Sequence, residues 1–233
     1  MRLTRFLAIG VLAGGLVACG ADQDQGSSSV QQRPSPSATP KVAIVAEGEL
    51  RRPATVPAEA NIFGAGHREP PAPGGGGPGL LPTRWRLPEG ADRVVTFPKA
   101  IGRVTPIVDR AGENGPRGDG AGPTDVSSYG GISGIVHRHN GMFLVGVFLT
   151  DDPAPRPPPR RLDFTRRERF HALAPRIAQT FLVGDGSGRS FRVPARATRL
   201  FLGFADGYLY KGFPGWYGNN DGELSVTVDM ASG

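Results

Sequence analysis

Cysteine is almost missing from this sequence, since Cys19 is the only one in 233 residues. A chain with one cysteine forms no intramolecular disulfide, so its folded part must depend on a hydrophobic core or on a metal. Histidine is also scarce, with four residues. There is no His-Glu-x-x-His pair and no serine in a nucleophile elbow. We therefore expect a protein that is not an enzyme.

Lysine is nearly absent as well, so the net charge of +6 comes from arginine. Runs of arginine at 51–52, 156–161 and 166–169 could bind nucleic acid electrostatically. These runs are scattered and not interleaved with aromatic residues, which argues against a nucleic-acid partner. Attraction to anionic lipid headgroups or envelope polymers is the better alternative, and an ordinary solvated surface is the simplest one.

No stretch keeps an apolar period of 3.6 residues over four turns, which excludes long amphipathic helices. Short apolar segments instead alternate with the 35 glycines and 23 prolines; they cover residues 93–97, 101–104, 142–149, 179–183, 190–193, 198–202 and 223–228. This layout predicts an all-β fold, an antiparallel β-sandwich or jelly roll over residues 56–233. Segment 142–149 is apolar without alternation, so we expect a central strand covered on both faces.

The N-terminus has the pattern of a lipoprotein signal. A basic start is followed by an apolar run over residues 6–17 and by Leu-Val-Ala-Cys ending at Cys19. The run is too short to span a membrane as a helix. We expect residues 1–18 to be a signal peptide and Cys19 to be lipidated, which anchors an exported protein to the bacterial cell-envelope membrane. An ordinary signal peptide with an incidental cysteine is the alternative.

Residues 19–55 are rich in Ser, Gln, Pro and charge and contain few large apolar side chains. Such a segment buries too little apolar surface to offset its conformational entropy. We therefore expect a disordered linker that tethers the folded domain.

Two other patterns resemble ligand sites but lack an essential part. The glycine run at 74–77 has no Gly-Lys-Ser/Thr ending and no helix after it, so it fits a covering loop better than a phosphate site. His137 and His139 would share one face of a strand and could form a metal pair, but the sequence shows no third ligand nearby.

The loop between segments 198–202 and 223–228 carries most of the candidate chemistry. Asp206, Asn219, Asn220 and Asp221 offer hard oxygen donors there, and glycine and proline let backbone carbonyls turn inward. Calcium takes about 6–8 oxygen ligands from carboxylates, amides, carbonyls and water. The loop therefore suits Ca²⁺, while a hairpin turn without any metal is the alternative.

This loop also carries a resemblance to a known family. Phe-Pro-Gly-Trp-Tyr-Gly-Asn-Asn-Asp-Gly-Glu-Leu-Ser-Val-Thr-Val, residues 213–228, resembles the closing segment of the PA-IL (LecA-like) galactose-binding lectins, Pro-Gly-x-Tyr-Gly-Asn-Asn-x-Gly-x-Phe-x-Val. Gly-Pro-Arg-Gly-Asp at 115–119 resembles that family's Gly-Pro-x-Gly-Asp. The match covers the last third of the chain well and residues 56–150 loosely. It implies a small β-sandwich with one Ca²⁺ at its end, bridging to sugar hydroxyls.

The resemblance also implies a set of metal ligands. Asn219 and Asn220 would contact Ca²⁺ through their side chains, and Trp216 would give its backbone carbonyl. The family's aspartate before Val-Pro-Gly is replaced by Gly212 here, so Asp206 is the nearest candidate if an insertion follows it. A site with fewer carboxylates binds calcium more weakly.

Sugar recognition departs further from the family. Its sugar-contacting His and Gln fall at Gly122 and Asp125, and its backbone calcium ligand falls near Val108. Galactose specificity is therefore not carried over.

The flat rings of Tyr208, Phe213, Trp216 and Tyr217, together with Asp125, are the candidate carbohydrate contacts. Two functions from different classes remain open. One is a surface-tethered, calcium-dependent carbohydrate-binding module, with the membrane and glycans as partners. The other is a structural envelope domain that uses the same loop as a metal staple or a plain turn.

Overall fold

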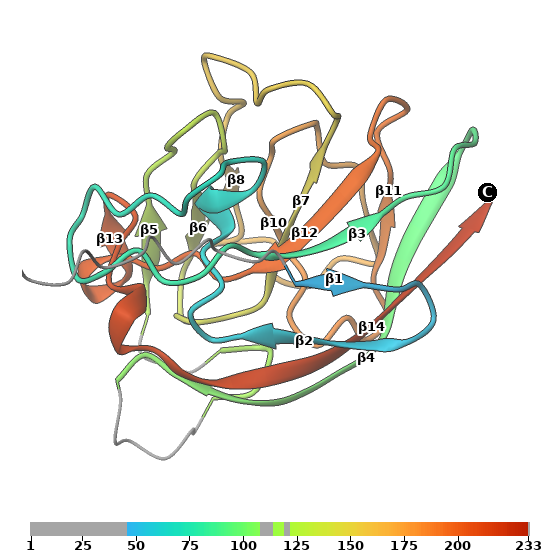
Figure 1. The fold of residues 1–233 in the computed structure, drawn as a ribbon. Helices are drawn as coiled ribbons and strands as arrows, with labels where there is room; N and C mark the ends of the chain where they lie inside the picture. The colour runs from blue at the N-terminus through green and yellow to red at the C-terminus, as the bar shows by residue number, and fades with distance from the viewer. Residues whose placement is uncertain (1–45, 108–113, 119–121, 233) are drawn as a thin grey trace, which may run out of the picture. The chain divides into compact units, whose positions relative to one another are not determined.

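The computed structural model describes residues 46–107, 114–118 and 122–232 (Figure 1). All of them belong to one of the two units into which the chain divides, Lys41–Gly233. The expected signal peptide, Cys19 and most of the expected tether lie outside the described residues. Within that part of the chain, no helix combines the length and the hydropathy needed to cross a membrane.

The described residues form strands and three short 3-10 helices, and no α-helix occurs among them. The elements are β1 (Glu47–Gly48), β2 (Pro53–Pro57), η1 (Ile62–Gly64), β3 (Thr83–Arg86), β4 (Arg93–Thr105), β5 (Thr124–Val126), β6 (Ile135–His137), β7 (Val145–Leu149), β8 (Leu162–Asp163), β9 (Ala172–Leu173), β10 (Phe181–Leu182), β11 (Ser190–Arg192), β12 (Arg199–Gly203), η2 (Tyr208–Tyr210), β13 (Lys211–Gly212), η3 (Tyr217–Asn219) and β14 (Asp221–Ser232). The expectation of an all-β fold is confirmed.

The strands form three sheets, two of which lie one above the other in Figure 1. The five-stranded sheets have the orders β1-β3-β12-β7-β10 and β2-β14-β4-β11-β9, and a four-stranded sheet has the order β13-β5-β6-β8. The central pairs are antiparallel, as expected, but the pairs β1–β3, β9–β11, β5–β13 and β6–β8 are parallel. Each parallel pair includes a two-residue strand at the end of a sheet.

The larger hydrophobic core lies between the two five-stranded sheets. It joins Trp85, Phe148 and Leu200 of one sheet to Phe97 and Leu224 of the other. These side chains are almost completely buried. Removing this much apolar surface from water is the main source of stability in a domain without disulfides.

A second core covers the opposite face of the sheet that contains β7. Val145 and Val147 of β7 pack there with Phe201 of β12 and with Val126 and Ile135 of the four-stranded sheet. Residues 142–149 are therefore all buried, because alternate side chains enter different cores. The expectation of a strand covered on both faces is confirmed for Val145–Leu149, while residues 142–144 are buried but precede the strand.

The folded domain begins earlier than the tether boundary at residue 55 predicts. Glu47 of β1 pairs with Arg84 of β3, and Ala54 of β2 pairs with Val226 of β14. β2 starts and ends with proline and lies at the end of its sheet, where a missing N–H removes no ladder bond. The prolines of β2 are typical of a linker, which explains why the sequence predicts a tether over these residues.

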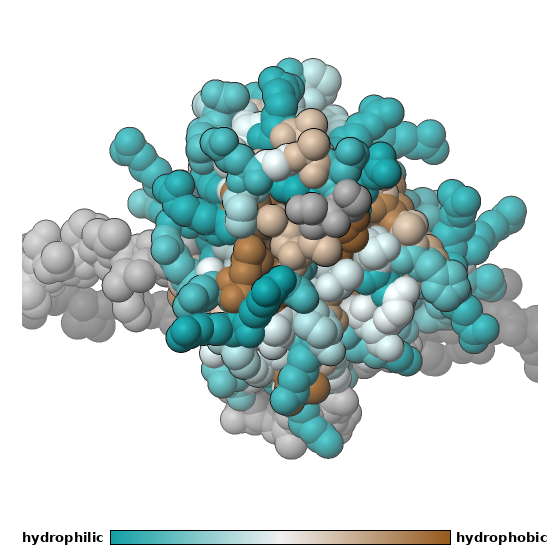
Figure 2. Space-filling model, turned by 90° about the vertical axis from the view of Figure 1, so that its right-hand side faces the viewer, coloured by the Kyte–Doolittle hydropathy of each residue, from teal (hydrophilic) through white to brown (hydrophobic). Residues whose placement is uncertain are grey.

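Figure 2 shows the face of the molecule that lies on the right-hand side in Figure 1. Most of this face is hydrophilic, and smaller hydrophobic areas lie near the middle of the view. The loop that joins β12 to β14, with η2 and β13, lies at the left-hand end of Figure 1. That loop contains three of the most exposed large hydrophobic side chains among the described residues, Tyr208, Leu209 and Phe213.

Candidate functional site

The loop between β12 and β14 is closed at its base by backbone contacts. Gly207 and Pro214 form an isolated antiparallel bridge, and the amide of Gly215 donates to the carbonyl of Asp206 at 3.2 Å. η2 and β13 lie within this closed loop, and η3 leads from it into β14. The geometry brings the start of the loop, at Asp206, next to its end.

The glycine-rich segment 74–79 covers the second half of this loop, in agreement with the prediction of a covering loop. Backbone hydrogen bonds of 2.8–3.2 Å join residues 74–77 to residues 214–218, and the indole N–H of Trp216 donates to Gly74 O at 3.1 Å. Gly79 has a φ of +68°, and a Cβ there would lie 2.4 Å from Glu59 O and 2.5 Å from Tyr217 Cβ. Only glycine allows this close approach.

Asp206 and Asn220 face one another inside the loop. The Nδ2 atom of Asn220 donates to Oδ2 of Asp206 at 3.0 Å, and the amide of Gly207 donates to Oδ1 at 2.7 Å. Both side chains are buried, with 3% and 4% of their surface exposed. Burial raises the pKa of Asp206 to about 7, although the hydrogen bonds from Asn220 and Gly207 oppose this rise. None of the ion pairs among the described residues reaches Asp206.

The side-chain oxygens of Asn219 and Asn220 are buried and have no hydrogen-bond partner in the described structure. The nitrogen of each amide is engaged: Asn219 donates to Pro106 O at 2.6 Å, and Asn220 also donates to Ala58 O at 3.3 Å. A buried polar atom without a partner costs about 1–3 kcal/mol. Only Asn220 contacts the Asp206 carboxylate, whereas the Asn219 side chain is directed to Pro106. Buried amide oxygens without a partner are the kind of exception that a bound ion or water explains.

Trp216 and Tyr217 are neighbouring aromatic residues that the sequence predicts as carbohydrate contacts. Trp216 is partly accessible to solvent, whereas Tyr217 is not. Trp216 is half-buried and has a left-handed backbone, with φ of +68°. Tyr217 is fully buried; its hydroxyl donates to Phe204 O and accepts from the Asp206 amide, both at 3.0 Å. Burial raises its pKa well above the ordinary value. The prediction that Tyr217 contacts a sugar is therefore wrong, because its ring belongs to the core.

Two aromatic residues of the same loop, Tyr208 and Phe213, are exposed to solvent. Tyr208 and Phe213 are each 60% exposed, and the Tyr208 ring lies 5.1 Å from the Trp216 ring at an angle of 45°. Leu209 is 70% exposed with φ of +51°. We call Tyr208, Leu209 and Phe213 the exposed shelf. Leu209 was missed from the sequence, and its apolar side chain between two tyrosines in a glycine-rich loop was the available signal.

Asp125 is connected to the exposed shelf through the pairing of β5 with β13. It sits on β5, directly opposite Lys211 of β13, which follows η2. Its carboxylate accepts from Arg161 at 2.5 Å, so it is already engaged in an exposed ion pair. The expected positions near Val108 and at Asp119 lie outside the described residues.

The candidate metal ligands are Asp206, the amide oxygens of Asn219 and Asn220, and the Trp216 carbonyl. No group of three or more His, Cys, Asp or Glu side chains suited to a metal occurs in the described ranges. A set of one carboxylate with amides and carbonyls is of the oxygen type that calcium uses, at a low ligand charge. Comparison with protein-family models and with curated proteins gave no match for this chain.

Proposed function

We propose that this protein binds carbohydrate with the help of Ca²⁺ at the loop between β12 and β14. One observation carries the proposal: the buried Asp206 carboxylate faces Asn220, while the side-chain oxygens of Asn219 and Asn220 are buried without partners. A cation there would offset the cost of burying a carboxylate. The resemblance of residues 213–228 to PA-IL lectins supports the same assignment.

The donor set fits a weak calcium site. Asp206 supplies the charge, and turning the Asn220 amide by 180° exchanges its nitrogen and oxygen beside Asp206 without a change in shape. Asn219 and the Trp216 carbonyl would complete the protein ligands. With a single carboxylate we expect a dissociation constant of about 10⁻⁴–10⁻³ M, which is usual for extracellular modules.

The exposed shelf would hold the sugar. Aromatic faces pack on the apolar C–H face of a sugar ring, and Tyr208 is held in place by its contact with Trp216. We further propose that the domain is exported and attached through a lipid on Cys19 to the cell-envelope membrane. Such a tether would place the shelf at the cell surface, where glycans are available.

A structural role is the second candidate, and a specific contact favours it. The Asn220 amide nitrogen joins Ala58, before η1, to Asp206, after β12. This polar contact can hold the loop on the sandwich without a metal when Asp206 is protonated. In that case the protein would be an envelope domain without a ligand.

A glycan array probed with the full chain separates these functions. The proposal predicts glycan binding in 5 mM Ca²⁺ that is lost in EGTA. Tyr208→Ala should weaken this binding about tenfold or more, while Tyr129→Ala, which changes an exposed tyrosine between β5 and β6, should not. No retained glycan, or binding that EGTA and Tyr208→Ala leave unchanged, would contradict the proposal and favour the structural role.

A further inference from the structure

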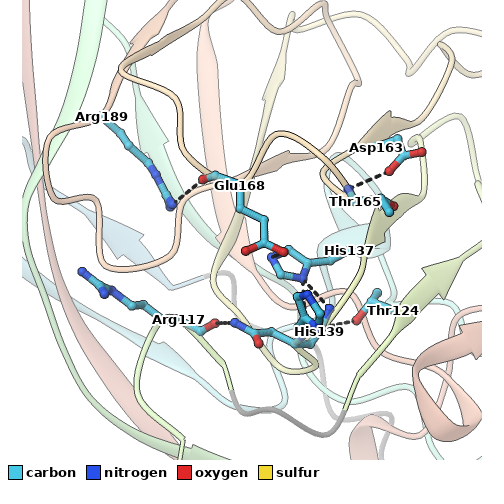
Figure 3. Close-up of polar contacts among 9 residues, drawn as sticks. Arg117, Thr124, His137, His139, Asp163, Thr165, Glu168 and Arg189 are labelled. Carbon is cyan, nitrogen blue, oxygen red and sulfur yellow. Dashed lines mark hydrogen bonds and ion pairs between the residues drawn. The ribbon is translucent and has the colours of Figure 1, made fainter.

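A second buried polar centre lies at the end of β6. The side chain of His137 is 3% exposed, and its ring packs against Phe143 with 4.9 Å between the centroids. Its Nδ1 atom accepts hydrogen bonds from the backbone amides of His139 and Asn140, both at 3.2 Å (Figure 3). The imidazole thus caps the turn that follows its own strand.

This geometry fixes the protonation state of the ring. An Nδ1 atom that accepts two N–H groups carries no proton, so the neutral imidazole keeps its hydrogen on Nε2. Nε2 points toward the Glu168 carboxylate, whose Oε1 lies 4.0 Å away (Figure 3). Protonation of Nδ1 would replace an acceptor with a donor that faces two other donors.

The charged groups around His137 come from three segments. Glu168 favours the protonated ring, whereas His139 and Arg189 oppose it, and burial, the largest effect, lowers the pKa of His137 below 6.5. Arg189 is itself held in place, since its guanidinium donates to Val183 O at 2.7 Å and Glu168 O at 3.1 Å. Burial and geometry therefore both favour the neutral ring in the folded protein.

The capped turn connects several parts of the domain. Asn140 accepts from the Thr124 hydroxyl at 2.6 Å and donates from its side chain to Arg117 O at 2.9 Å. The amide of Gly122 donates to His139 O at 2.8 Å. Gly141 lies so close to Tyr210 that an added Cβ would be 2.4 Å from its ring. Opening this turn would loosen β5, segment 114–118 and the packing beside η2.

We propose that His137 is a pH-sensitive cap: in mildly acidic solution a proton on Nδ1 releases the amides of His139 and Asn140 and opens the turn at 138–141. This device needs neither calcium nor a sugar. Because the folded pKa lies below the unfolded value of 6.5, the unfolded or opened chain binds more protons as pH falls. The equilibrium constant for the closed turn should then fall by up to about tenfold per pH unit below 6.5, until the folded pKa is reached.

NMR of the isotope-labelled full chain between pH 7.5 and 5 tests this proposal. We expect His137 to be the Nε2–H tautomer at pH 7.5 and to titrate below 6.5. Protection of the His139 and Asn140 amides against hydrogen exchange, corrected for the intrinsic pH effect, should decrease along the same curve. Protection that stays constant while His137 titrates, or an Nδ1–H tautomer at pH 7.5, would overturn the proposal.

Two variants separate the cap from a general acid effect. In His137→Asn the side-chain oxygen can accept the same backbone N–H groups but does not titrate, so the pH dependence of amide protection should disappear. His139→Asn removes the neighbouring histidine and leaves the cap, so the pH dependence should remain. Equal pH dependence in His137→Asn and wild type would also contradict the proposal. If His137→Asn does not fold, the wild-type titration alone decides.

Discussion

The Oδ2 atom of Asp206 lies 3.0 Å from the amide nitrogen of Asn220, and both side chains are buried. Asp206 follows β12 and Asn220 precedes β14, so this contact joins the two ends of the loop. The two ends of the loop are therefore joined through a carboxylate that forms no ion pair with a cationic side chain of the described residues. The predictions below test what that arrangement costs and what relieves it.

The first prediction concerns the Tyr217 hydroxyl, which accepts a hydrogen bond from the backbone amide of Asp206. Tyr217→Phe keeps the buried ring but removes the bridge between the Asp206 amide and the Phe204 carbonyl. The Asp206 amide then loses the hydroxyl that accepts its hydrogen bond, while the Phe204 carbonyl keeps the Ile62 amide, so the free energy of unfolding should decrease by about 1–3 kcal/mol. Urea denaturation measures the decrease. Tyr208→Phe, at an exposed position, is the control and should stay within about 0.5 kcal/mol.

The second prediction tests the covering segment with two glycines that differ only in their surroundings. Gly79 and Gly75 both have a positive φ, but a Cβ at Gly79 would collide with Glu59 O and Tyr217, whereas one at Gly75 meets nothing within 4 Å. Gly79→Ala should therefore lower the melting temperature more than Gly75→Ala, which adds backbone strain of only about 1–2 kcal/mol. Equal losses would show that segment 74–79 does not pack as described.

The third prediction follows from the raised pKa of Asp206. The pKa of Asp206 is about 7 in the folded protein and 3.8 for an ordinary aspartate. Between pH 3.8 and 7 the Asp206 carboxyl is therefore protonated in the folded protein and ionised in the unfolded chain. In metal-free protein, the free energy of unfolding should thus decrease as pH rises from 4 to 8, by up to about 4 kcal/mol. Asp206→Asn should lack this decrease. Identical pH profiles of the two proteins, kept in EDTA, would exclude an uncompensated carboxylate.

The fourth prediction concerns the membrane anchor. If Cys19 receives a lipid, Cys19→Ser should abolish labelling by a radioactive fatty acid and leave the precursor uncleaved or released from the membrane. Fractionation of cells expressing the wild type and the variant measures this. Unchanged fractionation and migration of the variant would show that Cys19 is incidental.

Several strands could be predicted because their apolar pattern is local. Segments 198–202 and 223–228 lie within one residue of β12 or inside β14. Segments 93–97 and 101–104, predicted as two strands, form the single strand β4. Where they join, Phe97 and Pro98 of β4 lie opposite the single residue Val228 of β14, and this bulge accommodates the missing N–H of Pro98. The apolar pattern of the two segments does not show that a bulge joins them.

The contact between Asp206 and Asn220 was predictable only in part. A hairpin of the two flanking segments would bring them together, but β12 and β14 belong to different sheets, so their contact depends on how the two sheets pack. The direction of Tyr217 was not predictable, because it depends on the left-handed backbone of Trp216 and on cover from segment 74–79, which is far away in sequence. Nothing in the pattern of either segment reveals that they pair.

The central claim is that Asp206 and its amide neighbours bind calcium, and thermal unfolding of the full chain tests it most directly. With a dissociation constant of about 10⁻⁴–10⁻³ M, 10 mM Ca²⁺ should stabilise the protein by about 1.4–2.7 kcal/mol. The melting temperature should therefore rise by roughly 3–10 °C. Asp221→Asn, which removes the exposed neighbouring carboxylate, should keep this rise, and Asp206→Asn should lose it. No rise in the wild type, or an equal rise in Asp206→Asn, would contradict the account.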